Sequence, residues 1–179
     1  MAEEIETPLE HLTEEIHEAA EHAKENWLKW AALLSAVFAV MAAIAGLKAS
    51  HDVNTAMIEQ IKASDQWGYY QAKGIKSKII ESQNDILKQI GKPQDKTQDE
   101  QIDKYKSEQK EIGDKAEKLA KSSEYLLERH EVFSKAVTLF QVAIALIAIT
   151  VLTKRRRFLL VSVALGVFAS GFFIHGMII

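Results

Sequence analysis

The feature that most constrains this chain is a run of four consecutive cations, Lys154, Arg155, Arg156 and Arg157. It separates two apolar runs, 136–153 and 158–179, and neither run contains Lys, Arg, Asp or Glu. Each run is long enough to cross the bilayer core as a helix. A loop this short makes the two helices antiparallel, and the positive-inside rule places a basic loop in the cytoplasm. We therefore expect two transmembrane helices joined by a basic cytoplasmic loop at 154–157.

A third apolar run, 30–47, lies nearer the N-terminus and is preceded by Trp27 and Lys29, which are typical of a membrane interface. Small residues at four-residue intervals on the membrane helices indicate close helix packing, because lipid tails give helices no hydrophobic reason to associate. These rows are Ser35, Ala39 and Ala43 in the run 30–47 and Ser162, Gly166 and Ser170 in the run 158–179. The sequence predicts an all-α protein with three transmembrane helices.

Between the first two spans, residues 48–135 are polar but keep a helical period. An apolar stripe follows the first half, and it ends at Gly91 and Pro93, which are typical of a helix C-terminus. The second half carries a heptad seam: Ile102, Tyr105, Gln109, Ile112, Ala116, Leu119, Ser123, Leu126, His130, Phe133, Val137 and Phe140. We predict an antiparallel coiled-coil hairpin with its turn near 91–97. The topology places this hairpin and the C-terminus outside the cytoplasm.

The heptad seam has three polar exceptions, Gln109, Ser123 and His130. Buried polar residues in coiled coils often fix register, and we expect this role for all three. For His130 the alternative is a switch or ligand role.

Residues 1–29 predict an acidic amphipathic helix on the cytoplasmic side, with a capping box at Thr7 and Glu10. Three histidines, His11, His17 and His22, lie among its glutamates, so a metal site is an alternative to a solvated acidic face. The spacing lacks the H-E-x-x-H motif and does not bring the histidines to one face. We favour the solvated face and predict no metal or cofactor.

Charge is divided unevenly along the chain. Nine acidic residues lie in 1–30, whereas 48–135 carry sixteen acids and sixteen bases. The cations are either matched by acids or explained by topology, so the composition gives no basic patch for nucleic acid. Cysteine is absent, which excludes disulfide and thiol chemistry.

The central segment Ala63-Ser64-Asp65-Gln66-Trp67-Gly68-Tyr69-Tyr70-Gln71-Ala72-Lys73-Gly74-Ile75-Lys76 resembles a bacterial membrane-protein family, the domain of unknown function 4337. The resemblance extends to Leu9-Glu10-His11 with Glu14-Glu15-Ile16-His17, and to 129–131 and 136–145. It implies a location in the bacterial inner membrane and implies no activity.

Within this segment Ser64, Gly68 and Ala72 are small at every fourth position. We favour a close helix crossing covered by aromatic side chains. The alternative is a partner-docking patch formed by Trp67, Tyr69 and Tyr70, because Trp and Tyr are enriched at interface hot spots.

Three apolar spans and a long seam indicate a non-enzymatic membrane subunit, in contact with lipid, that assembles with itself or within a larger membrane complex. A homo-oligomeric pore is the alternative, and its candidate lining residues are Ser35, Thr138, Gln141 and Thr150. An enzyme is disfavoured, because no nucleophile–base pair, phosphate loop or strong metal motif is present. A sensor is a further alternative, since a long extracytoplasmic hairpin could transmit a signal to the N-terminal helix.

Overall fold

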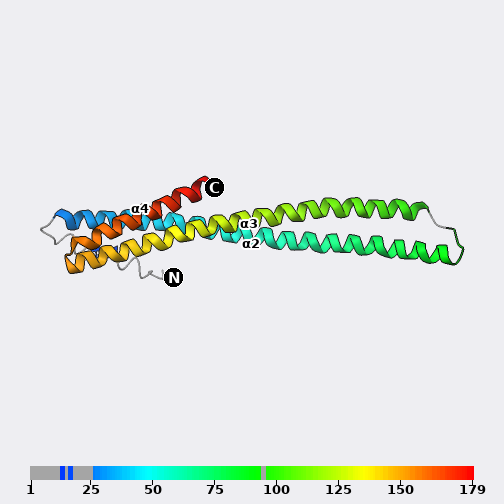
Figure 1. Cartoon of the computed structure of the whole chain (residues 1–179), viewed down its shortest axis with the longest axis horizontal. Helices are drawn as coiled ribbons and strands as arrows, with labels where there is room; N and C mark the ends of the chain where they lie inside the picture. The colour runs from blue at the N-terminus through cyan, green and yellow to red at the C-terminus, as the bar shows by residue number, and fades with distance from the viewer. Residues whose placement is uncertain (1–12, 15, 18–25, 94–95) are drawn as a thin grey trace, which may run out of the picture. The chain divides into compact units, whose positions relative to one another are not determined.

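The computed structural model describes residues 13–14, 16–17, 26–93 and 96–179. Three long helices account for almost all of them: α2 (Asn26–Gln89), α3 (Lys96–Thr153) and α4 (Arg156–Ile178) (Figure 1). Within these described ranges there is no strand, which confirms the all-α prediction. Each of the three helices is long and apolar enough to cross a membrane.

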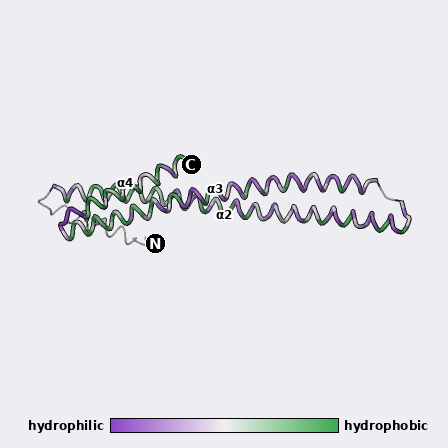
Figure 2. Tube along the Cα trace, in the orientation of Figure 1, coloured by the Kyte–Doolittle hydropathy of each residue, from purple (hydrophilic) through white to green (hydrophobic). Residues whose placement is uncertain are grey.

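The chain divides into two compact units. We call residues 1–53 with 128–179 the apolar unit, and residues 54–127 the polar unit. The two differ plainly in hydropathy, as Figure 2 shows. Helices α2 and α3 each contribute to both units without a break, so the predicted boundaries at 47/48 and 135/136 are not helix ends.

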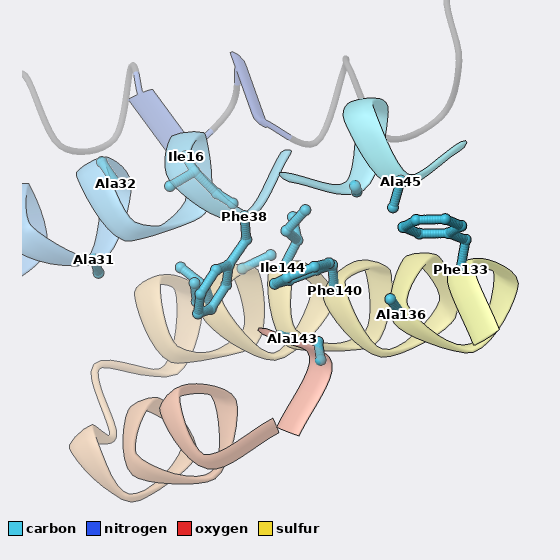
Figure 3. Close-up of a cluster of buried hydrophobic side chains, with 14 of the residues drawn as sticks. Ile16, Ala31, Ala32, Phe38, Ala45, Phe133, Ala136, Phe140, Ala143 and Ile144 are labelled. Atoms are coloured by element: carbon cyan, nitrogen blue, oxygen red, sulfur yellow. The ribbon is translucent and has the colours of Figure 1, made fainter. Parts of the chain in front are cut away.

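The apolar unit is built on small residues that alternate with phenylalanines. Alanines 31, 42, 45 and 49 lie on the buried face of α2, and alanines 136 and 143 lie on that of α3. Their short side chains leave room for the rings of Phe38, Phe133 and Phe140, and the Phe38 and Phe140 centroids are 5.6 Å apart (Figure 3). Close packing of this kind is how membrane helices associate without a hydrophobic driving force.

Helix α4 packs into this cluster through its own small residues. Ser162 donates a 2.8 Å hydrogen bond from Oγ to the carbonyl of Ala143 on α3. A Cβ atom at Gly166 would lie 1.9 Å from Cζ of Phe38, so only glycine admits that ring. Most of α4 nevertheless faces outward, since its buried residues are Ser162, Gly166, Ala169 and Gly176.

In the polar unit α2 and α3 run antiparallel, joined through the turn that follows α2 (Figure 1). The end of α2 is a Schellman motif: Gly91 has φ 70°, its N–H bonds to Lys88 O, and the N–H of Lys92 bonds to Leu87 O. Gly91 is therefore required by its left-handed backbone, as expected from the sequence.

On α2 the residues that face α3 recur every seventh position. They are Ala56, Ala63, Tyr70, Ser77 and Asn84, all buried or half-buried. The facing positions of α3 include the buried Ile102, Ala116 and Ser123. All twelve residues of the predicted α3 seam are buried or half-buried.

Most of the predicted N-terminal helix, 1–29, lies outside the described residues. Of its central part, Ile16 is described and is buried in the apolar cluster (Figure 3).

Candidate functional site

A buried ion pair joins α2 to α3 just beyond the apolar segments. Asp52 has no exposed surface, and Arg129 contacts both of its oxygens, with Nε 2.8 Å from Oδ2 and Nη2 2.5 Å from Oδ1. A bidentate guanidinium is the partner best suited to a desolvated carboxylate. The pair fixes how the two helices face one another at this level, because each charge is costly to bury without the other. Neither residue stands out in the sequence, where each looks like an ordinary surface charge.

His130 lies beside this pair and is also bound to α2. Its Nδ1 is 2.8 Å from the carbonyl oxygen of Ala49. That oxygen can only accept, so Nδ1 carries the proton, and in the neutral ring Nε2 accepts from the hydroxyl of Ser134 at 3.4 Å. The ring also borders an open groove of about 490 Å³, lined by His130, Glu131, Ser134, Lys135, Thr138, Leu139 and Phe172.

The other two polar exceptions of the α3 seam make equivalent bonds in the polar unit. Gln109 donates from Nε2 to Tyr70 O at 3.2 Å, and Ser123 donates from Oγ to Ala56 O at 2.8 Å. From Gln109 to Ser123 is fourteen residues forward, and from Tyr70 to Ala56 is fourteen residues back. The two bonds therefore fit one and the same antiparallel register of α2 and α3. Fixing this register is the role that we expect for both residues.

Partly exposed ion pairs flank the inner face of the polar unit. The Lys73 ammonium contacts Glu108 and lies 5.0 Å from the centroid of the Tyr105 ring, while Lys106 is 2.7 Å from Glu81. A hydrogen bond from Lys73 lowers the pKa of Glu108 below its ordinary value of 4.5. A hydrogen bond to Glu81 raises the pKa of Lys106 above 10.5. These pairs are stronger guides to helix orientation than to stability, because water screens them.

The aromatic segment is placed differently from the favoured interpretation. Ser64, Gly68 and Ala72 are exposed, and nothing lies within 4 Å of a Cβ built on Gly68. The close approach occurs instead at Gly74, where a Cβ would lie 2.5 Å from Nε2 of Gln109, and at Gly113, where it would lie 3.2 Å from the Tyr70 ring.

The aromatic residues themselves are split between two environments. Trp67 and Tyr70 meet edge to face with centroids 5.2 Å apart, whereas Tyr69 is 61% exposed. A surface hollow of about 420 Å³ lies beside the first two. It mixes rings with both signs of charge: Trp67, Tyr70, Lys106, Gln109, Lys110, Gly113, Asp114 and Glu117.

The predicted rows of small residues in the spans are only partly at the helix contacts. Ser35 is buried, Ala39 half-buried and Ala43 exposed. Ser162 and Gly166 are buried, and Ser170 is half-buried and donates to Gly166 O at 2.8 Å.

The basic loop lies at the end of the apolar unit where α2 begins. Lys154, Arg155, Arg156 and Arg157 are all exposed, and the Arg156 guanidinium lies 5.4 Å from the centroid of the Trp27 ring. Lys154 has φ 54° and Arg155 is extended, which reverses the chain between α3 and α4.

The three histidines that were weighed as metal ligands lie in the N-terminal segment. His17 is described and its Nδ1 lies 3.0 Å from Thr13 O, while His11 and His22 lie outside the described residues. Within the described ranges no group of three or more His, Cys, Asp or Glu residues could hold a metal ion.

The predicted coiled-coil hairpin implied that the apolar stripe of α2 faces α3, and this expectation is wrong. The structure turns it outward: Met57, Ile61, Ile75, Ile79, Ile86 and Ile90 are each more than half exposed. The fully buried residues of α2 in the polar unit, Ala56, Ala63, Ser77 and Asn84, are instead small or polar. The signal that could have shown this is their spacing by multiples of seven residues.

These features define an all-helical protein with three candidate membrane-spanning helices and a register fixed by polar side chains. The chain belongs to the family described as domain of unknown function (DUF4337), whose model matches residues 27–179. The similarity noted at Leu9–His17 lies outside that match. No match was found among curated proteins or among solved structures.

Proposed function

We propose that this protein is a non-enzymatic membrane subunit that assembles with itself as a scaffold, alone or within a larger membrane complex. It crosses the bacterial inner membrane three times, with its N-terminus in the cytoplasm. The helix pair of the polar unit and the C-terminus lie outside the cytoplasm.

The topology is supported by the position of the basic loop. Arg156 and Trp27 lie together, so the start of α2 and the α3–α4 loop share one end of the apolar unit. An interfacial tryptophan beside a cationic loop is typical of a cytoplasmic membrane face. The antiparallel pair of the polar unit is a coiled coil in this proposal, because both inner faces follow a seven-residue repeat.

Self-assembly is carried by one observation: within the polar unit, α2 holds most of its large apolar side chains on the outside. Its buried residues on α2 are Ala56, Ala63, Ser77 and Asn84, which together bury little apolar area, while the isoleucines of the stripe face water. A two-helix pair with so thin a core is marginal alone. Covering the outer stripe with further helices supplies the missing burial.

The test is native mass spectrometry of the tagged chain, extracted in mild detergent from its native membrane. We expect a single species at a fixed multiple of the 20.1 kDa chain, or one with a stoichiometric second protein. A protein that stays monomeric across the concentration range would contradict the proposal.

A pore formed by a ring of copies is the second candidate, favoured by the placement of Gln141. This residue lies within the apolar run 136–153 and is exposed, as is Thr138 about one turn earlier. An amide facing hydrocarbon is unfavourable, and either a neighbouring copy or a water path would satisfy it. Ion flux through purified protein in liposomes, abolished by Gln141→Leu, would support the pore over the scaffold.

A further inference from the structure

We propose that two copies of this chain pair side by side, in parallel, through the outer stripe of α2. The stripe comprises Met57, Ile61, Ser64, Gly68, Ala72, Ile75, Ile79, Gln83, Ile86 and Ile90, all exposed. This inference rests on the proposed self-assembly and names its surface, partner and orientation.

The period of the stripe is that of a helix built to pack along its whole length. Met57, Gly68, Ile79 and Ile90 are spaced by eleven residues, and the remaining members fall between them in steps of three and four. An eleven-residue repeat corresponds to about 3.67 residues per turn, so the stripe stays on one side of a nearly straight helix. A second helix with the same repeat matches it from end to end, and a second copy of this chain supplies one.

The size of the stripe comes close to what a pair requires. From Met57 to Ile90 the helix rises about 50 Å at about 1.5 Å per residue. A contact strip about 9 Å wide, the usual spacing of packed helices, then covers roughly 450 Å² on each copy. The total of roughly 900 Å² approaches the ~1,000 Å² of a biological interface.

The charges at the borders of the stripe are compatible with pairing to itself. One border carries the uncharged Gln60, Gln71 and Ser82. The other carries Asp65 and Lys76, which are eleven residues apart. In a parallel pair with two-fold symmetry each border meets the opposite border of the partner. Asp65 and Lys76 then lie against amides and a hydroxyl, and no like charges face each other.

The membrane decides the orientation of the pair. Helix α2 carries the first apolar run and, after it, the stripe. Copies that share one membrane and one topology both begin the stripe at the same membrane face, so the pair that we propose is parallel. The two-fold axis runs along the helices.

The absence of cysteine from the chain makes a direct test possible. Met57→Cys and Ile79→Cys, made separately in the full chain and oxidised in native membranes, should each form a disulfide-linked dimer. An antiparallel pair can bring only one of these positions onto its own symmetry axis. Lys115→Cys, on the exposed face of α3, is the matched control and should cross-link at least about tenfold less. Failure of either stripe variant to exceed this control would overturn the proposal.

A second pair of variants separates this inference from the proposed function. Ile79→Lys replaces an exposed side chain, so the helix pair should stay folded while self-association weakens at least about tenfold. Ser107→Lys, exposed on α3, is the control and should leave association unchanged. If Ile79→Lys associates as well as the parent, another surface joins the copies and the stripe is excluded, although the scaffold stands. If the parent itself is monomeric, both proposals fail.

Discussion

At the scale of the residue, Asp52 shows how much a single side chain can depend on one partner. Its carboxylate is fully buried and is held by the guanidinium of Arg129. The attraction is offset by the cost of removing both groups from water, so the pair as a whole contributes little net stability. Its effect is on specificity: any arrangement of the helices that separates the two residues leaves a buried charge without a partner and is strongly disfavoured.

We therefore expect Arg129→Met to lower the free energy of unfolding by about 3–5 kcal/mol, because it leaves a buried carboxylate without a partner. The double variant Asp52→Leu with Arg129→Met should recover most of that loss. Thermal unfolding in detergent, followed by circular dichroism, measures both. Equal losses in the single and double variants would show that the pairing is unimportant.

A glycine of α4 makes a second prediction at this scale. Gly166→Ala places a methyl group against the Phe38 ring and should cost about 1–3 kcal/mol through overpacking. Gly171→Ala, on the same helix with nothing within 4 Å, is the control and should be neutral or slightly stabilising. The same unfolding assay compares them, and indistinguishable variants would place α4 elsewhere.

At the scale of the element, α2 carries two patterns that face opposite ways. The inner one repeats every seven residues and is small or polar, and the outer one repeats every eleven and is apolar. The three α3 side chains that bond to α2 carbonyls, Gln109, Ser123 and His130, hold the register that the weak inner packing cannot enforce. Polar bonds thus do in this pair what apolar interdigitation does in most coiled coils.

The sequence predicted the helices, the turn at Gly91 and the seam of α3, because these are encoded by local pattern and capping chemistry. It could not predict which face of α2 meets α3. Hydrophobic periodicity points to the most apolar stripe of a helix. Ala56, Ser77 and Asn84 are buried for a different reason: their side chains are small or polar and let the two helices approach closely. The Asp52–Arg129 pair was also missed, since its two members are far apart in sequence and look like ordinary surface charges.

The ion pairs of the polar unit predict a dependence on pH. The lowered pKa of Glu108 means that its bond to Lys73 stabilises the fold above pH 4.5, and that this contribution is lost as the pH falls through the lowered value. The raised pKa of Lys106 acts on the alkaline side: its contribution is present below pH 10.5 and is lost as the pH rises through the raised value.

The measurement is the unfolding temperature of the parent and of Glu108→Gln across pH. We expect the variant to be less stable at neutral pH and the difference to vanish in acid. Both groups are partly exposed, so about 1 M salt should shrink the difference, since the screening length there is about 3 Å. A difference that persists in acid would assign the effect to packing instead.

At the scale of the whole molecule, the basic loop and the turn at Gly91 make the topology testable. In intact cells a membrane-impermeant maleimide should label Lys92→Cys, which lies in the exposed turn. Arg155→Cys should be labelled only after the membrane is opened, because three cations remain to hold the loop inside. The reversed pattern would invert the topology, and labelling of both in intact cells would show that the chain is not oriented in one way.

The two repeats on α2 also bear on how such a helix can change in length. Deleting seven residues from both α2 and α3 would preserve their mutual register but rotate the outer stripe, whereas deleting eleven would keep the stripe and misalign the inner face. The shortest excision that leaves both faces in place is about eighteen residues, five whole turns at about 3.6 residues per turn. A helix that must satisfy two partners at once cannot be shortened or lengthened gradually. The length of α2 can therefore change only in steps of about that size.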